Sequence, residues 1–513
     1  MNRRDAIRTA AAAAAAVAAS IATGAAPVLA ATDPQPLRRG GSSAQPSSGQ
    51  PVPARPAAAQ PATEILVRGG RIVNADGGVF ADVRIVGERI TEVGPGLTAG
   101  PDARVVDAAG HLVMPGGIDP HAHLQGSFVD DLTTGTSAAV AGGITTVGTF
   151  AYAEDDENPV EAMDRWLAEV PRMAVGDVFF HASSWPPTPE LAAMMPSLAA
   201  RGQPSHKIFM TRGDFGTHRR ALIDVLDAAR DAGVVTLMHC EDGAILNAAL
   251  TRLRDEGRTS LAYYAESRPE VAEIAATQDA VALCAHTGAP MHFVHLSSAR
   301  TLDAARDPAF GALPITIETR PLYLYFTEEW LRGPDGPLYI GQPPLRSAAD
   351  VEAMWQGLRD GRVDMLATDH APWTRAQKMD PELNVGRLRP GVSDLRFVRP
   401  VLFSEGVRRG RISAERYVEV TSTAAAKAFG LYPDRGVIRE GSFGDVMILD
   451  PDLAHVVDAT DDPSNSDYTP FQGWALTGWP VMTIRRGEVV YEEGRVVGRA
   501  GSGRPAVRSP WGG

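Results

Sequence analysis

Short runs of alternating hydrophobic and polar residues stand near both ends of the chain. Between residues 64 and 115, the segments EILVRGGRIVN, FADVRIVGERITEVG and ARVVDAAGHLVMP follow this pattern, with glycine-rich turns between them. The same alternating pattern recurs after about residue 434, in GVIREGSFGDVMILDPD and VMTIRRGEVVYEEGRVVG. Each group is too short to fold alone. The pattern therefore predicts that residues 63–115 and 434–505 form one small β-sandwich.

Between these two groups, hydrophobic runs alternate with stretches of helical period. DVLDAARDAG and AVALCAHTGA are typical of the helical stretches, because their hydrophobic residues recur every three or four positions. Eight hydrophobic runs are candidate strands, at 113–119, 145–150, 178–183, 206–210, 234–239, 291–296, 315–319 and 363–368. Eight strand–helix units without a GxGxxG motif after the first strand predict an α/β fold. In this fold, residues 116–433 form a (β/α)8 TIM-like barrel rather than a doubly wound sheet.

The first 62 residues differ from the rest. Residues 1–30 combine a basic start, MNRRDAIR, with an alanine-rich apolar stretch and small residues before Ala30, which predicts a signal peptide. Arg3 and Arg4 resemble a twin-arginine signal, and the alternatives are an ordinary secretory signal or an uncleaved anchor. We therefore expect an exported protein, periplasmic or secreted. Residues 31–62, rich in Pro, Ala and Ser, predict a disordered leader, and residues 506–513 a short tail.

The composition narrows the possible partners. With 44% hydrophobic and 22% charged residues, the chain has the balance of a soluble globular protein. A net charge of −13 disfavours nucleic acid, and no stretch after the signal is long and apolar enough for a stable membrane anchor. The two cysteines, Cys240 and Cys284, are expected to be free and buried, since 513 residues provide enough core without a disulfide.

Metal-binding residue types stand where the predicted barrel strands end. Asp119, His121 and His123 alternate at the end of the first strand, so all three can point into the barrel mouth. The ends of later strands add Lys207, His239, His295 and Asp369. Two imidazoles held side by side favour a divalent cation, which takes up their lone pairs. The arrangement predicts a metal site at the mouth, where barrel enzymes carry their chemistry.

A lysine among such ligands needs its own explanation. Burial and nearby cations would lower the pKa of the Lys207 ammonium, and the neutral amine can then react with carbon dioxide. The resulting carbamate is an anion that two metals can share. The alternative is a lysine that extends from the strand end towards solvent.

The remaining histidines are expected to have simpler roles. His181 stands near the end of the third strand and could also reach the mouth. His292 has the wrong offset from the proposed ligands and is expected to pack. His370 follows Asp369 and either orients it or packs in the core.

A series of motifs runs through the chain in order and includes GGIDPHAHL, HKIFM, HCEDG, VHLSSA, ETRPLYLYFT, QPPLRS and ATDHAPW. With this series, residues 64 to about 500 resemble the amidohydrolase superfamily, and within it the dihydropyrimidinase and hydantoinase family of cyclic amidases. The resemblance implies a hydrolase that acts on carbon–nitrogen bonds other than peptide bonds, in cyclic amides.

The resemblance also implies a binuclear site with two divalent metal ions, usually Zn²⁺. The more buried ion would be held by His121, His123 and Asp369 and the more exposed one by His239 and His295, with carboxylated Lys207 as the bridge. A metal-bridging hydroxide would be the nucleophile. We expect Asp369 to be catalytic, because a carboxylate beside this water can carry its proton to the leaving nitrogen.

Three positions around the expected substrate depart from the family pattern. Arg212 stands where a tyrosine usually follows the lysine, and Gln342 replaces the serine before the PPLR element. The usual NGVPGVE loop reads RPGVSDLR, starting at Arg389. An arginine in such a place can stabilise an oxyanion or bind a substrate carboxylate. We expect all three residues to contact the substrate.

Two other functions stay open at this point. The same site could hydrolyse a linear amide, such as an N-acyl or N-carbamoyl amino acid. A non-catalytic assembly protein of the same fold is the other alternative, although such relatives have lost metal ligands that this chain keeps. The expected partner is a small cyclic amide, and the resemblance implies a homo-oligomer, either a tetramer or a dimer.

Overall fold

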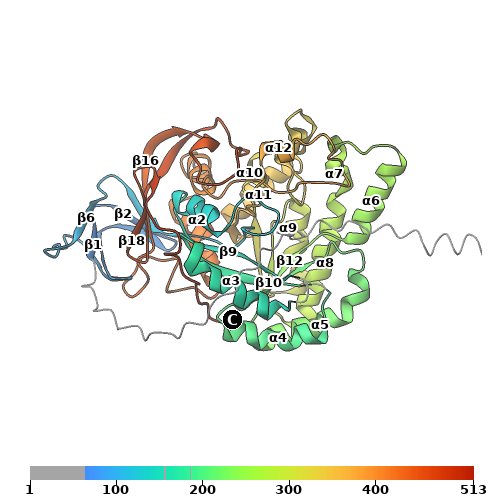
Figure 1. Cartoon of the computed structure of the whole chain (residues 1–513), viewed down its shortest axis with the longest axis horizontal. Coiled ribbons are helices and arrows are strands. Elements are labelled where there is room, and N and C mark those ends of the chain that lie inside the picture. Colours follow the sequence, from blue (N-terminus) through green and yellow to red (C-terminus); the bar gives the residue numbers. More distant parts are fainter. Residues whose placement is uncertain (1–63, 155–156, 185, 513) are drawn as a thin grey trace, which may run out of the picture. The chain divides into compact units, whose positions relative to one another are not determined.

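The computed structural model describes residues 64–154, 157–184 and 186–512 (Figure 1). The predicted signal peptide (1–30) and the predicted leader (31–62) lie outside the described residues. Among the helices of the described part, none combines the length and the hydropathy that a membrane span needs. Both cysteines are buried and free, as the sequence predicted.

Two mixed sheets form the β-sandwich. The first has four strands, in the order β5 (Arg89–Gly94), β4 (Asp82–Val86), β1 (Glu64–Arg68) and β6 (Arg104–Asp107). The second has seven, in the order β19 (Arg495–Val496), β18 (Glu488–Glu492), β17 (Ala475–Arg485), β16 (Val446–Val456), β7 (Leu112–Pro115), β2 (Arg71–Asn74) and β3 (Gly77–Phe80). Ile65, Val83, Val113 and Ile448, from both sheets, belong to one buried core. The predicted sandwich of N- and C-terminal strands is confirmed.

The third sheet is the barrel, which is parallel and follows chain order. Its strands are β8 (Gly117–Asp119), β9 (Ile144–Tyr152), β10 (Asp177–Ser183), β11 (Ser205–Phe209), β12 (Val235–His239), β13 (Met291–Phe293), β14 (Ile315–Thr319) and β15 (Met365–Leu366). Each strand pairs in parallel with the next one. The predicted (β/α)8 barrel is therefore confirmed.

Helices fill the crossovers between the barrel strands (Figure 1). They are α2 (Leu132–Ala141), α3 (Pro159–Met173), α4 (Pro189–Ala200), α5 (Arg219–Ala232), α6 (Gly243–Asp255), α7 (Tyr264–Ser267), α8 (Glu270–Thr287), α9 (Ala299–Ala305), α10 (Leu322–Tyr325) and α11 (Ala348–Asp360). Helix α5 shows the sequence logic, because it buries Leu222, Val225, Leu226 and Ala229 on one face. It ends at Gly233, whose φ of 65° is the left-handed conformation that favours glycine.

Shorter helices complete the chain. After β15 come α12 (Arg375–Lys378), α13 (Val398–Leu402), α14 (Ala414–Val418) and α15 (Ala424–Ala428), with the π-helical turns η6 (Phe403–Val407) and η7 (Glu419–Thr423). The 3₁₀ helices are η1 (Phe215–His218), η2 (Leu261–Tyr263), η3 (Pro308–Phe310), η4 (Glu328–Arg332), η5 (Gly336–Tyr339) and η8 (Ala459–Asp461).

The barrel closes through residues that follow its first and last strands. Ala122 and His370 form a parallel bridge, and the His123 amide donates to the His370 carbonyl over 2.7 Å. The Thr368 hydroxyl donates to the His121 carbonyl over 3.3 Å. This closure brings residues 121–123 beside residues 368–370, so metal-binding side chains from the two ends of the barrel sheet meet.

The single strand predicted at 113–119 is wrong, because the structure divides it at Gly116. Strand β7 pairs with β16 in the sandwich, whereas β8 pairs with β9 in the barrel. A Cβ at Gly116 would lie 2.4 Å from the Thr145 hydroxyl oxygen, so a larger residue does not fit at this crossing. Hydrophobicity is continuous through both strands, which is why the sequence pattern did not show the change of sheet.

Two buried connections hold the sandwich and the C-terminal segment against the barrel. Asp177, at the start of β10, forms ion pairs with Arg435 (2.5 Å) and Arg486 (2.9 Å). Burial alone would raise the pKa of Asp177, but these arginines outweigh it and hold the pKa below its usual value. Residues 504–511 bind the strand starts, where Ala506 donates to the Val178 carbonyl and Arg508 to the Gly202 carbonyl.

Candidate metal centre

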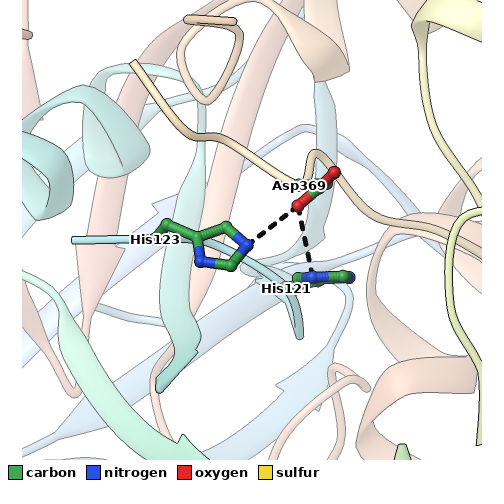
Figure 2. A group of neighbouring side chains, drawn as sticks. All are labelled: His121, His123 and Asp369. Carbon is green, nitrogen blue, oxygen red and sulfur yellow. Dashed lines mark hydrogen bonds and ion pairs between the residues drawn. The ribbon is translucent and has the colours of Figure 1, made fainter. Parts of the chain in front are cut away.

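Three predicted ligands form a compact group at the point of barrel closure (Figure 2). The Oδ1 atom of Asp369 lies 3.0 Å from His123 Nε2 and 3.2 Å from His121 Nε2. One ligand atom from each of the three residues lies within 4.8 Å of the others, close enough for one cation to contact all three. Asp369 and His123 each keep 12% of their side chains exposed while His121 keeps 1%, so the group is reached from the side of Asp369 and His123.

The backbone is strained at two of the predicted ligands. Asp369 has a φ of 49° and His295 a φ of 43°, a left-handed conformation that residues other than glycine rarely adopt. His295 comes two positions after the end of β13, and Asp369 comes three positions after the end of β15. Such strain persists only where the surrounding structure holds it, and it is typical of functional sites.

The other three predicted ligands lie around this group. The rings of His239 and His295 are 4.5 Å apart between centroids, and those of His121 and His295 are 5.5 Å apart. The Lys207 ammonium lies 5.2 Å from the Phe209 ring centroid. Its charge acts on His239 and His295, since it contributes to lowering the pKa of each after the larger effect of burial. The six predicted ligands, from five strand ends, therefore lie in one region, in which His121, His123 and Asp369 have their ligand atoms gathered.

The donor set fits divalent cations. Lys207 Nζ and His295 Nδ1 are buried and have no hydrogen-bond partner among the described residues. Burial lowers the pKa of His121 to about 4 and that of Lys207 to about 8. The imidazole is therefore neutral near pH 7, and the lysine is easier to deprotonate than usual. Neutral imidazoles beside a carboxylate are the ligands that zinc and similar metals prefer.

Comparison with known proteins decides the family. The pattern that defines the Amidohydrolase family matches residues 112–490. A D-hydantoinase of Ralstonia pickettii is 33% identical over 449 residues, which are 86% of this chain and 98% of that protein. The chain belongs to the amidohydrolase family.

Solved structures place it more narrowly, beside the hydantoinases. The D-hydantoinase (dihydropyrimidinase) of Thermus sp. matches with a TM-score of 0.84 and 31% identity, over 87% of this chain and 99% of that one. The dihydropyrimidinase of Brevibacillus agri gives 0.81 and 32%, over 88% and 100%. The predicted hydantoinase family and the prediction of an enzyme are both confirmed, and the amidohydrolase fold here carries a group suited to a divalent metal.

The sequence did not predict the two carboxylates that orient the ligands of this amidohydrolase. Glu318 lies 2.5 Å from His121 Nδ1 and 2.9 Å from His292 Nε2, and it accepts from the His295 amide over 3.1 Å. Burial alone would raise the pKa of Glu318, but His121 and His292 hold it below its usual value. Since the carboxylate accepts from Nδ1, the Nε2 atom of His121 is free for a metal.

Glu241 supports one residue of the other histidine pair, His239. Its carboxylate lies 2.7 Å from His239 Nε2 and accepts from Arg268 Nε over 3.0 Å. Burial would raise its pKa, but Arg268 and His239 lower it to about 2. This contact leaves Nδ1 as the ring nitrogen with which His239 would bind a metal. The motif HCEDG contained this residue, but its role depends on a contact that sequence alone does not give.

The three predicted substrate residues lie on separate loops. Arg212 is half-buried in the turn after β11, and Gln342 is half-buried after η5. Arg389 lies with its guanidinium 4.9 Å from the Trp373 ring centroid. Lys378 joins two of these loops, because its buried ammonium donates to the carbonyls of Ile340 (2.8 Å), Arg389 (2.7 Å) and Gly391 (2.9 Å). Substrate contact by these residues stays a prediction.

The other histidines have definite places. Both His181 nitrogens are engaged, with Ser205 Oγ at 2.7 Å and the Pro120 carbonyl at 2.8 Å, so it does not serve the mouth. His370 Nε2 donates to Asp130 over 2.9 Å. His292 was expected only to pack, but it also supports Glu318 and, through Glu318, His121.

We predict that Glu318→Gln weakens divalent metal binding about 10- to 100-fold, since it removes the charge that orients His121. Competition with a chelator on the zinc-loaded protein measures this change. Glu415→Gln is the matched control, because Glu415 pairs with Arg71 at the surface. Unchanged affinity in a folded Glu318→Gln protein would mean that His121 needs no such support.

Proposed function

We propose that this enzyme hydrolyses a carbon–nitrogen bond in a cyclic amide, such as a hydantoin or a dihydropyrimidine. The observation that carries the proposal is the group of His121, His123 and Asp369 at the mouth of a hydantoinase-family barrel. The names of the relatives, D-hydantoinase and dihydropyrimidinase, support the substrate class. A linear amide is the less favoured substrate because no observation of the site points to it.

We propose two divalent ions, Zn²⁺ by preference. One would be held by His121, His123 and Asp369 and the other by His239 and His295, with carboxylated Lys207 shared between them. Bound cations of this kind act as Lewis acids and make water a nucleophile near neutral pH. The unpaired Nζ of Lys207, buried within the described residues and with a lowered pKa, supports the carbamate.

Asp369 is the residue that we propose as the proton carrier. Burial alone would raise its pKa, but Arg320, His121 and His123 hold it well below the usual value, so the group is an ionised acceptor at neutral pH. It is also the ligand carboxylate that keeps contact with solvent. In the proposed reaction the water oxygen bonds to the amide carbon, Asp369 takes the water proton, and the ring C–N bond breaks as the nitrogen accepts this proton.

A substrate panel tests the function. We expect the zinc-reconstituted protein to open 5-substituted hydantoins or dihydropyrimidines much faster than it cleaves N-acyl or N-carbamoyl amino acids. Asp369→Asn should lose about 10²- to 10⁴-fold in kcat, the usual contribution of a proton carrier. Asp231→Asn, at an exposed pair with Arg230, is the matched control. Faster turnover of linear amides would overturn the ring assignment, and an active Asp369→Asn would overturn the proton role.

The carbamate has a direct test. Native mass measurement of the metal-loaded protein should show the mass of one carbon dioxide above the sequence mass, and Lys207→Arg should abolish this increment. Full metal occupancy without the increment would contradict the bridging role of Lys207.

We also propose export through the twin-arginine route, which carries folded proteins and so suits a site that is loaded with metal beforehand. Replacing Arg3 and Arg4 by lysine should retain the protein in the cytoplasm of a bacterial host that has this route. N-terminal sequencing of the exported wild type should start after Ala30. Export of the double-lysine variant at the normal level would indicate an ordinary secretory signal. A dimer or tetramer stays a prediction for sedimentation analysis.

A further inference from the structure

Arg320 is a buried cation beside the proposed proton carrier. It follows β14 directly, two residues after Glu318, and its solvent exposure is 0%. Its Nη1 atom lies 2.9 Å from Asp369 Oδ2. The two oxygens of the Asp369 carboxylate are thereby distinguished, because Oδ1 faces the imidazoles of His121 and His123 while Oδ2 faces the guanidinium.

The described residues offer this guanidinium little else. None of its three nitrogens makes a hydrogen bond of good geometry within the described ranges, so the contact with Asp369 is an ion pair. A buried guanidinium without a counter-ion is unfavourable. Asp369 is the carboxylate in direct contact with it, while Asp394 acts on it more weakly and the Tyr323 ring centroid lies 5.8 Å from its Cζ atom.

The burial of Arg320 indicates on which side of Asp369 it acts. The arginine side chain is 1% exposed and the Asp369 side chain 12%, so the guanidinium lies behind the carboxylate as seen from solvent. A substrate that approaches through the mouth reaches Asp369 first. Arg320 is therefore placed to act on Asp369 rather than on the substrate.

We propose that Arg320 is a positioning residue, which holds Asp369 Oδ2 so that Oδ1 stays directed at His121 and His123. The left-handed backbone at Asp369 makes such a restraint necessary, because a strained residue relaxes unless its surroundings hold it. The proposal rests on the proposed function in so far as Asp369 is the proton carrier. Its geometric part, the orientation of the carboxylate, stands without that function.

Gly341 gives an independent way to move the guanidinium. A Cβ at this position would lie 2.5 Å from Arg320 Nη1 and 3.2 Å from Cζ. The side-chain end of Arg320 would have to move, since the added methyl group is fixed to the backbone. Gly341→Ala therefore shifts the guanidinium relative to Asp369 while the arginine itself is kept.

The first test compares Arg320→Met with Arg320→Lys. We expect Arg320→Met to lower kcat about 10- to 100-fold with little change in KM, as is typical when the partner of a ligand is lost. Arg320→Lys, which keeps the charge, should recover part of kcat, and Gly341→Ala should lower it in the same way as Arg320→Met. A rise in KM at constant kcat would overturn the proposal, because it would show direct binding of the substrate.

Chemical rescue separates positioning from a merely structural role. Guanidinium chloride at millimolar concentration should raise kcat of Arg320→Ala, whereas urea, of similar shape but neutral, should not. Equal effects of the two compounds would overturn the proposal. Arg375→Met is the matched control, because Arg375 pairs with Asp335 at the surface and its loss should leave kcat and KM unchanged.

A crystallographic comparison makes the outcome independent of activity. At equal metal loading, the Asp369 carboxylate should turn or become disordered in Arg320→Met and in Gly341→Ala. An unmoved carboxylate in both variants would overturn the proposal. If the wild type opens no cyclic amide, the proposed function fails, and the orientation of Asp369 in these variants still decides the role of Arg320. If Arg320→Met does not fold, Gly341→Ala carries the same test.

Discussion

The backbone hydrogen bond from the His123 amide to the His370 carbonyl is the contact on which the site depends. The last barrel strand has only two residues, so the strands themselves contribute little to closing the sheet. Closure is achieved by the residues just beyond them, which are the same residues that carry the metal-binding side chains. Folding of the barrel and assembly of the centre are therefore one event, and any change that opens this seam separates Asp369 from its histidines.

Buried charge around the centre is balanced by pairing three of the predicted ligands with a group behind them. Glu318 supports His121, Glu241 supports His239, and Arg320 faces Asp369. In such a low-dielectric region an unpaired charge is costly, so each of these groups restrains its neighbour and is restrained by it. The left-handed backbone at His295 and Asp369 is tolerated within this network. A bound metal would satisfy the ligand nitrogens that have no partner among the described residues.

Much of the architecture follows from patterns that the sequence displays. Strands of period two, helices of period 3.6 and polar residues at strand ends were enough to predict the barrel and to select six candidate ligands, three of which form the compact group at its mouth. Residue parity shows which face a side chain takes, but it does not show which partner it meets across the barrel. Glu318 and His121 are 197 positions apart, and Arg320 was visible only as one letter of the motif ETRPLYLYFT. The sequence pattern did not show the change of sheet at Gly116 for a similar reason, because strands in both sheets need the same hydrophobic residues.

The segment 504–511 lies across the starts of three barrel strands, at the end opposite the mouth. Its backbone pairs with Val178, Gly202 and Gly233, which precede or begin β10, β11 and β12. During synthesis residues 504–511 leave the ribosome after every part of the barrel. The barrel peptide groups that they cover therefore remain hydrogen-bonded to water until this segment has been made. Loss of residues 504–511 would consequently damage the catalytic domain itself, because barrel backbone groups would lose their partners.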